Sequence, residues 1–136
     1  QTFKLAGATN LVFDTSGRTL YPDSISSNGV VVVLGRVGVN FGAGMTGGFA
    51  YVLDEQRNFV DRYNHELIDI HRIVAEHMEG HRHYLIDLLR NYVEATGSEW
   101  GQEIIDDFRD YVGKFWLAKP KAADIGSLLS AIRAAA

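Results

Sequence analysis

The sequence contains no cysteine, and proline occurs only twice among its 136 residues. Without cysteine, the chain cannot form disulfide bonds, use a thiolate nucleophile, or supply thiolate ligands to zinc or to an iron–sulfur cluster. The absence is compatible with the cytosol, and we expect a cytoplasmic protein. Each of the two prolines, Pro22 and Pro120, is predicted to end an element of secondary structure.

Basic charge is also scarce, and the net charge of −4 is unevenly spread. Residues 1–53 carry three basic and two acidic side chains, a balance of +1, whereas residues 54–136 carry ten basic and fifteen acidic side chains, a balance of −5. No basic stripe is available to neutralise phosphates, so nucleic acid is not an expected partner.

Residues 24–53 hold a single charged side chain, Arg36, but they do not predict a membrane span. Seven glycines between positions 29 and 48 weaken any helix through this run, by about 1 kcal/mol each relative to alanine. We therefore expect no membrane partner. The sequence starts at Gln1 without a signal peptide, which fits a piece of a longer chain.

The first of three regions, residues 1–28, is polar and rich in turn-forming residues. An apolar stretch at residues 11–13 precedes the turn-forming sequence DTSG, and a second short stretch follows at residues 18–21. This arrangement predicts an antiparallel hairpin.

The second region, residues 29–63, contains two short apolar segments that each follow a glycine. Residues 30–34 have the sequence VVVVL and residues 49–53 the sequence FAYVL, at an offset of nineteen residues. A strand that recurs about every 20 residues with glycine corners is typical of a parallel β-solenoid, because glycine accepts positive φ and lets successive turns approach closely. A plain antiparallel meander would explain two copies almost as well.

The third region, residues 64–136, is predicted to be mostly helical after a last short strand within residues 66–73. Gly97 is the predicted end of one helix, Ser98 the N-cap of the next, and Asp124 the cap of a third. The helices are expected to pack on the last strand and cover its open edge. Two apolar faces carry this prediction: Tyr84, Leu85, Leu88, Leu89, Tyr92 and Val93, and then Trp100, Ile104, Ile105, Phe108, Val112, Phe115 and Trp116.

Residues 42–47, with the sequence GAGMTG, match the dinucleotide-binding pattern G-x-G-x-x-G, and Asp61 follows at about the spacing of a ribose-binding acid. The context does not fit. The preceding strand ends near Leu34, and the residues after Gly48 favour a strand, so no helix N-terminus is available to hold a pyrophosphate. We interpret these glycines as solenoid corners.

All five histidines lie between His65 and His83, and His77 and His81 are spaced to share a helix face. The pair resembles a zincin motif only superficially, because Glu79 follows His77 by two positions and points off the metal face. Both histidines continue the apolar stripe, so we interpret them as packed side chains with hydrogen-bond partners at a helix end.

Paired carboxylates occur at Asp54 with Glu55 and at Asp106 with Asp107. A catalytic pair needs at least one group in a desolvated pocket, and these four positions are expected to face solvent. Residues 119–121 are expected to form a solvated turn. We therefore assign no catalytic, cofactor-binding or metal-binding residue to this chain.

Residues 35–54, with the sequence GRVGVNFGAGMTGGFAYVLD, closely resemble the final β-helix turns of the glutamate synthase large subunit. Three further segments resemble the family in its order: its exit from the β-helix, a helix–helix junction and its terminal segment, at residues 62–67, 96–98 and 114–121. The resemblance covers about residues 29–130. Residues 1–28 depart from the family pattern, so a divergent rung, a hairpin cap and unrelated sequence stay open there.

Pattern and resemblance together predict an α+β fold, with a short right-handed parallel β-helix portion followed by a C-terminal helical cap of two to three helices. Residues 1–28 would form a divergent hairpin or partial rung. Residues 29–74 would form the end of the glycine-rich (GXGXG) β-helix, and residues 75–136 the helical cap.

The resemblance implies a parent enzyme that makes glutamate from glutamine and 2-oxoglutarate. In that family an amidotransferase domain releases ammonia, and a central barrel with FMN and a 3Fe–4S cluster completes the reductive step. The C-terminal β-helix is a structural bracket between those domains. None of the family's catalytic, flavin or cluster residues maps onto a position here. The resemblance thus implies a non-catalytic module without its own cofactor, whose partners are the other domains of the large subunit and the small subunit.

Two rival functions stay open from the sequence. One is a binding or assembly module of another redox complex, in which an exposed first rung pairs with another chain. The other is a small zinc-dependent enzyme that uses His77 and His81.

Overall fold

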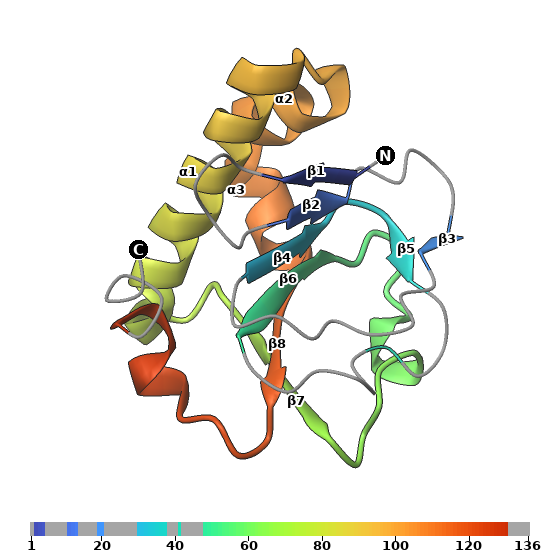
Figure 1. Ribbon diagram of the computed structural model, residues 1–136, viewed down its shortest axis with the longest axis vertical. Coiled ribbons are helices and arrows are strands. Elements are labelled where there is room, and N and C mark those ends of the chain that lie inside the picture. The colour runs from blue at the N-terminus through green and yellow to red at the C-terminus, as the bar shows by residue number, and fades with distance from the viewer. Residues whose placement is uncertain are drawn as a thin grey trace.

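The computed structural model describes residues 2–4, 11–13, 19–20, 30–37, 41 and 48–130. Over these residues the chain is mixed α+β, as the sequence predicts, with helices packed against one face of a six-stranded sheet (Figure 1). None of the helices in these ranges is long and apolar enough to cross a membrane.

The six-stranded sheet has the order β1-β2-β4-β6-β8-β7, and a separate two-stranded sheet pairs β3 with β5. Strands β2, β4 and β6 run parallel in the middle, while β1, β8 and β7 each run antiparallel to their neighbours. The strands are β1 (Thr2–Lys4), β2 (Leu11–Phe13), β3 (Thr19–Leu20), β4 (Val30–Val33), β5 (Arg36–Val37), β6 (Phe49–Leu53), β7 (Ile68–Arg72) and β8 (Phe115–Pro120).

The two apolar segments picked out by their nineteen-residue offset are β4 and β6, and they pair in parallel. Val30 lies opposite Phe49, which reproduces the offset of nineteen, so the antiparallel meander is wrong. Strand β2 extends the same arrangement, because Leu11 lies opposite Val31 at an offset of twenty. The glycines at positions 42, 44 and 47 lie outside the described residues, whereas Gly48, directly before β6, has φ of 67°.

The hairpin predicted between residues 11–13 and 18–21 is wrong, although β1 and β2 within residues 1–28 do pair antiparallel. Strand β2 does not pair with the segment that follows its turn. It lies between β1 and β4, and β3 instead pairs in parallel with β5. Turn-forming residues indicate that the chain changes direction, but they do not decide which strand becomes the neighbour. Here β2 pairs in parallel with β4, which consists of four valines.

Strands β4 and β6 are buried on both faces, so their side chains divide between two cores. Alternate residues point to opposite faces of a strand, which sends Tyr51 to one core and Val52 to the other. The helix-side core contains Val30, Val32, Leu34, Phe49, Tyr51, Leu53, Ile73, Met78, Leu85, Leu88, Leu89, Tyr92, Ile104, Phe115, Leu117 and Leu128. The loop-side core contains Val31, Val33, Val37, Phe41, Ala50, Val52, Phe59, Ile68 and Ala118.

The junction between the first two helices lies where the sequence predicts. Helix α1 (Glu79–Thr96) ends at Gly97, which has φ of 68°, a left-handed conformation that glycine adopts without strain. Ser98 caps α2 (Glu99–Asp106) by accepting a hydrogen bond from the Gly101 amide at 3.0 Å. The short helix α3 (Phe108–Tyr111) follows directly, and Figure 1 shows α1 alongside the sheet with α2 beyond its upper end.

The second predicted helical face does not continue through Phe115 and Trp116. These residues begin strand β8, which inserts between β6 and β7. Phe115 and Leu117 fill the helix-side core and Ala118 the loop-side core, a two-sided burial that requires a strand. The open edge of β6 is therefore covered by hydrogen bonding to a strand, not by helices alone.

Two smaller predictions have clear outcomes. The last short strand expected within residues 66–73 is β7, which confirms it. Asp124 caps a short 3-10 turn (Ile125–Ser127) by accepting a hydrogen bond from the Gly126 amide at 3.4 Å. Residues 128–130 are helical, and the rest of the predicted third helix lies outside the described residues.

Candidate functional site

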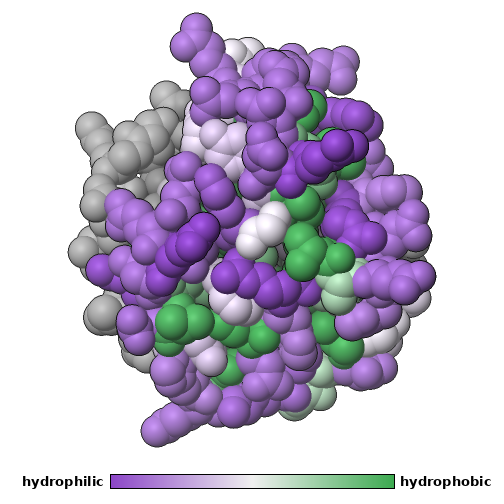
Figure 2. All heavy atoms as spheres, turned by 180° about the vertical axis from the view of Figure 1, so that it is seen from behind, coloured by the Kyte–Doolittle hydropathy of each residue, from purple (hydrophilic) through white to green (hydrophobic). Residues whose placement is uncertain are grey.

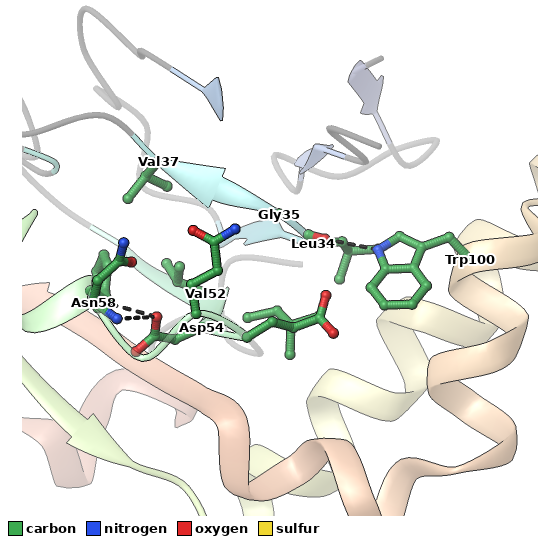
Figure 3. Close-up of a pocket in the computed structure, with 11 residues that line it drawn as sticks. Leu34, Gly35, Val37, Val52, Asp54, Asn58 and Trp100 are labelled. Atoms are coloured by element: carbon green, nitrogen blue, oxygen red, sulfur yellow. Dashed lines mark hydrogen bonds between the residues drawn. The ribbon is translucent and has the colours of Figure 1, made fainter. Parts of the chain in front are cut away.

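A cavity of about 480 Å³ lies where β4 and β6 end, and Trp100 of α2 borders it on the helix side (Figure 3). The indole Nε1 of Trp100 donates a hydrogen bond to the Leu34 carbonyl at 2.8 Å, which fixes the ring at the rim. The described residues that line the cavity are Leu34, Gly35, Val37, Val52, Leu53, Asp54, Glu55, Gln56, Asn58, Phe59 and Trp100.

Asp54 is the buried charged residue of this cavity, with 7% of its surface exposed. Its Oδ1 accepts hydrogen bonds from the amides of Asn58 at 3.0 Å and Phe59 at 3.2 Å, as Figure 3 shows for the turn after β6. Its Oδ2 accepts a hydrogen bond from Trp116 Nε1 at 3.0 Å. The prediction that Asp54 faces solvent is therefore wrong, because three donors compensate for the burial of the carboxylate.

Arg72 adds a cation to this arrangement. Its guanidinium carbon lies 3.6 Å from the centre of the Trp116 ring, and its Nη1 donates a hydrogen bond to the Gly113 carbonyl at 2.9 Å. Burial lowers the pKa of Arg72, and the negative charge of Asp54 opposes that shift. Arginine titrates so far above neutral pH that the side chain stays charged. Asp54, Trp116 and Arg72 thus form a polar anchor between β6, β8 and β7.

The other candidate carboxylates are exposed. Glu55, next to Asp54, is exposed, so the two have different environments. Asp106 and Asp107 are both exposed, as predicted, and Asp106 accepts a hydrogen bond from Gln102 Nε2 at 2.7 Å. The charge of each of these carboxylates is stabilised by solvent or by a local hydrogen bond.

His77 and His81 do not share a helix face. Helix α1 begins at Glu79, so His77 lies in the preceding 3-10 turn, where it is exposed. His81 is buried, its Nδ1 lies 2.7 Å from the Tyr51 hydroxyl, and the Phe49 ring packs edge-on at 5.4 Å. His81 is thus a packed histidine with a hydrogen-bond partner, as predicted, whereas the same prediction for His77 is wrong because its side chain is exposed. Among the residues described, no group of three or more His, Cys, Asp or Glu side chains could hold a metal ion.

Two functional groups on β7 and β8 escaped the sequence analysis. His71 Nε2 is buried without a hydrogen-bond partner, and burial, followed by the nearby positive charge of Lys119, lowers the pKa of the imidazole. Lys119 was expected in a solvated turn, but it is 5% exposed and its Nζ lies 3.4 Å from Asp69 Oδ2. Alternation along a strand would have placed Lys119 on the same face as Leu117, but the segment was assigned to the end of a helix.

The glycine pattern at residues 42–47 lies outside the described residues. The residues directly after it are described, and they form strand β6, not a helix. The dinucleotide-binding pattern requires a helix N-terminus at this point, so its structural context is missing.

Comparison with known proteins matches residues 25–121 to the GXGXG motif family. The chain is 48% identical over 94 residues to ferredoxin-dependent glutamate synthase 2 of Synechocystis sp. and 43% identical over 94 residues to a ferredoxin-dependent glutamate synthase of Pyropia yezoensis. It is 39% identical over 98 residues to the chloroplastic ferredoxin-dependent glutamate synthase of Spinacia oleracea. These matches cover 69%, 69% and 72% of this chain, but in each case only 6% of the relative.

Proposed function

The chain belongs to the GXGXG motif family, and from this membership we propose that it is a non-catalytic structural module of a glutamate synthase-type enzyme. The resemblance to glutamate synthase extends over about seven tenths of the chain, yet the chain spans only about 6% of the length of those relatives. The whole enzyme would transfer the amide nitrogen of glutamine reductively to 2-oxoglutarate, and this module would contribute to its architecture.

The observation that carries the proposal is the parallel register of β2, β4 and β6 at offsets of twenty and nineteen residues. We propose that these strands are successive turns of a right-handed parallel β-helix, since nearly all parallel crossovers are right-handed. The parallel pair β3 and β5 would be a second face of the same turns. Residues 29–74 would then end the β-helix, and residues 75–136 would close it.

The donor atoms of the chain support a role without its own redox cofactor. A 3Fe–4S cluster is bound by thiolates, and this sequence has no cysteine. The glycine pattern is followed by β6 instead of a phosphate-binding helix, which gives no support to a nucleotide or flavin phosphate site there. Asp54, the buried carboxylate at the cavity, is occupied by three donors. The FMN and iron–sulfur chemistry of the parent enzyme would therefore depend on other domains.

The partners of the module would be the other domains of the same large chain, together with a small subunit where the enzyme has one. Cytoplasmic localisation is part of the proposal for this chain, although a relative from Spinacia oleracea is named chloroplastic.

A domain exchange tests the proposal. In the Synechocystis enzyme, the segment that matches this chain is replaced by the corresponding residues of this chain, and glutamate formation is measured with glutamine, 2-oxoglutarate and reduced ferredoxin. We expect the exchanged enzyme to keep at least a substantial part of its activity. A matched variant with Val32→Asp, which places a charge in the fully buried helix-side core, should lose activity through misfolding.

The purified chain alone provides the complementary measurement. It should produce no glutamate under the same conditions and should copurify with neither FMN nor iron. Turnover of glutamine by the chain alone would contradict the non-catalytic role.

A further inference from the structure

Strand β7 is the last strand of the six-stranded sheet, and no described strand pairs with its outer edge. An uncovered strand edge presents backbone donors and acceptors to any extended segment that approaches it. The opposite end of the sheet has an edge of the same kind, because β1 pairs with β2 on one side and no described strand pairs with its other side. Of the two edge strands β7 is the longer, with five residues against three in β1, so it offers more backbone groups to a further strand.

The hydrogen-bond pattern defines which backbone groups face outward. The Lys121 amide donates to the Leu67 carbonyl at 3.0 Å, and in an antiparallel ladder such bonds recur at every second residue. Asp69 and His71 therefore direct their backbone groups towards β8. The remaining residues of β7 direct theirs outward, except that the Ile68 amide already donates to the Asn64 carbonyl at 3.0 Å.

Five outward groups result: the C=O of Ile68, and the N–H and C=O of both Ile70 and Arg72. Two large apolar side chains flank the strand, with Leu67 49% and Val74 50% exposed. Ile70 itself is half-buried against the loop-side core, so an apolar residue opposite it would extend that core. Figure 2 shows one face of the molecule, on which apolar surface lies in separate patches among polar side chains.

The charge near this edge differs in sign from that of the whole chain. Arg72, Lys119 and Lys121 stand against Asp69 and Asp54, a local balance of three positive charges and two negative, in a chain of net charge −4. A segment that adds to β7 would gain from carboxylates, because Lys121 is half-exposed and can reach them.

The size of the edge decides between a separate partner and a tethered one. Five residues extend about 17 Å, which is too short to bury the roughly 1,200–2,000 Å² of a stable interface between free chains. A segment of the same polypeptide needs far less area, because the tether raises its effective concentration. The relatives are long enough to supply such a segment, since this chain matches only 6% of their length.

We propose that the outer edge of β7 accepts an extended, acidic segment from another domain of the same glutamate synthase-type chain, which adds antiparallel or parallel to Ile68–Arg72 as a further strand. This inference rests on the proposed function and identifies the surface through which the module docks. Main-chain hydrogen bonds would hold the segment, and the apolar residue opposite Ile70 would set its register.

Hydrogen–deuterium exchange, resolved to single amides, tests the proposal on the domain-exchanged Synechocystis enzyme and on the isolated chain. In the isolated chain the Ile70 and Arg72 amides should exchange rapidly, while the Asp69 and His71 amides, which face β8, should be protected. In the enzyme, the Ile70 and Arg72 amides should exchange roughly 100-fold more slowly. Protection of Ile70 already present in the isolated monomer would overturn the proposal.

A pair of variants separates the backbone contribution from that of the side chain. Ile70→Pro removes the outward N–H and leaves the β8 ladder intact, whereas Ile70→Ala removes a comparable amount of side chain and keeps the N–H. In the enzyme, Ile70→Pro should return the Arg72 amide to the exchange rate of the isolated chain, and Ile70→Ala should preserve its protection. Equal protection in both variants would contradict strand addition.

The remaining outcomes are also decisive. An active exchanged enzyme with rapid exchange at Ile70 and Arg72 would overturn this inference and leave the proposed function standing. An inactive domain-exchanged enzyme would count against the proposed function. In that case amide exchange is measured at the aligned strand of the unmodified Synechocystis enzyme, and rapid amide exchange there would overturn strand addition. Concentration-dependent protection in the isolated chain, with a dimer seen by light scattering, would assign the edge to a second copy and overturn the intrachain proposal.

Discussion

The two sides of strand β6 are built in different ways. On one side β6 pairs in parallel with β4, its near neighbour along the chain, at an offset of nineteen residues. On the other side it pairs antiparallel with β8, and the Trp116–Asp54 hydrogen bond across this pair joins residues 62 positions apart. The parallel side repeats a local unit, whereas the antiparallel side ends the repetition.

This difference teaches how a repeating sheet can be brought to a stop. A further parallel strand would cover the open edge of β6 but would expose a similar edge of its own. Repeating parallel strands therefore always leaves one strand edge open. An antiparallel strand that returns after the helices changes the direction of pairing and brings new side chains into both cores. Strand β8 does this with Phe115 and Leu117 on the helix side and Ala118 on the loop side.

The comparison predicts that truncation costs more in the closing strand β8 than in the repeated strand β4, because β8 carries a buried ring and β4 only valines. Phe115→Ala removes a fully buried ring of β8 and should lower the free energy of unfolding by about 3–5 kcal/mol. Val31→Ala, on the parallel side, should cost only about 1.5 kcal/mol, because it removes two methyl groups. Urea unfolding followed by circular dichroism measures both, and equal losses would refute the distinction.

The polar anchor at the end of β6 gives the next largest expected effect. Asp54→Ala leaves the Asn58 and Phe59 amides and the Trp116 indole without their acceptor and should cost about 2–3 kcal/mol. Asp54→Asn should cost less, because it can keep an acceptor for the two amides. The exposed neighbour provides the matched control, since Glu55→Gln should leave the urea midpoint nearly unchanged. A similar loss in both Asp54→Ala and Glu55→Gln would exclude the anchor.

A smaller effect is expected where β6 meets helix α1. Tyr51→Phe removes the hydroxyl that lies 2.7 Å from His81 Nδ1 and should cost about 1 kcal/mol, since the ring packing with Phe49 stays in place. Thermal unfolding and the imidazole NMR signal of His81 report the change. An unshifted His81 signal in Tyr51→Phe would show that the two side chains do not interact in solution.

The smallest predicted effect is a pH dependence on the antiparallel side. Burial, and then Lys119, lowers the pKa of His71 below its ordinary value of 6.5, so the folded chain binds fewer protons than the unfolded chain. The contribution of His71 to stability is therefore fully present above pH 6.5 and is lost as the pH falls towards the folded-state pKa. Urea unfolding between pH 7.5 and 5.5 should show a shallower decline in His71→Gln than in the unaltered chain. Parallel declines would contradict the shift.

Local signals in the sequence predicted the parallel side and the helix ends. The repeated apolar segments defined β4 and β6, and the residues Gly97 and Ser98 marked a helix junction that the structure confirms. These features depend on short-range chemistry: β-branched residues in a buried strand, positive φ at glycine, and a hydroxyl that accepts a backbone N–H.

Long-range pairing was not predictable in the same way. Phe115 and Trp116 continue a helical spacing from Ile104. Nothing in the neighbouring sequence indicates that they pair with the distant strand β6. The burial of Asp54 and Lys119 was missed together with strand β8. Trp116 of β8 donates the hydrogen bond to Asp54, and Lys119 is itself a residue of β8. The hairpin prediction failed for the related reason that a turn does not choose its partner strand.

The position of β8 has a consequence for the order in which the protein can be completed during synthesis. A ribosome that adds about 5–20 residues per second needs about 3–12 s to extend the chain across the 62 positions from Asp54 to Trp116. Throughout this interval the emerging strand β6 offers an uncovered edge to other nascent chains. If synthesis is delayed or ends before Phe115, the incomplete chain keeps the unpaired edge of β6 and is prone to aggregate. In the completed chain β8 covers that edge.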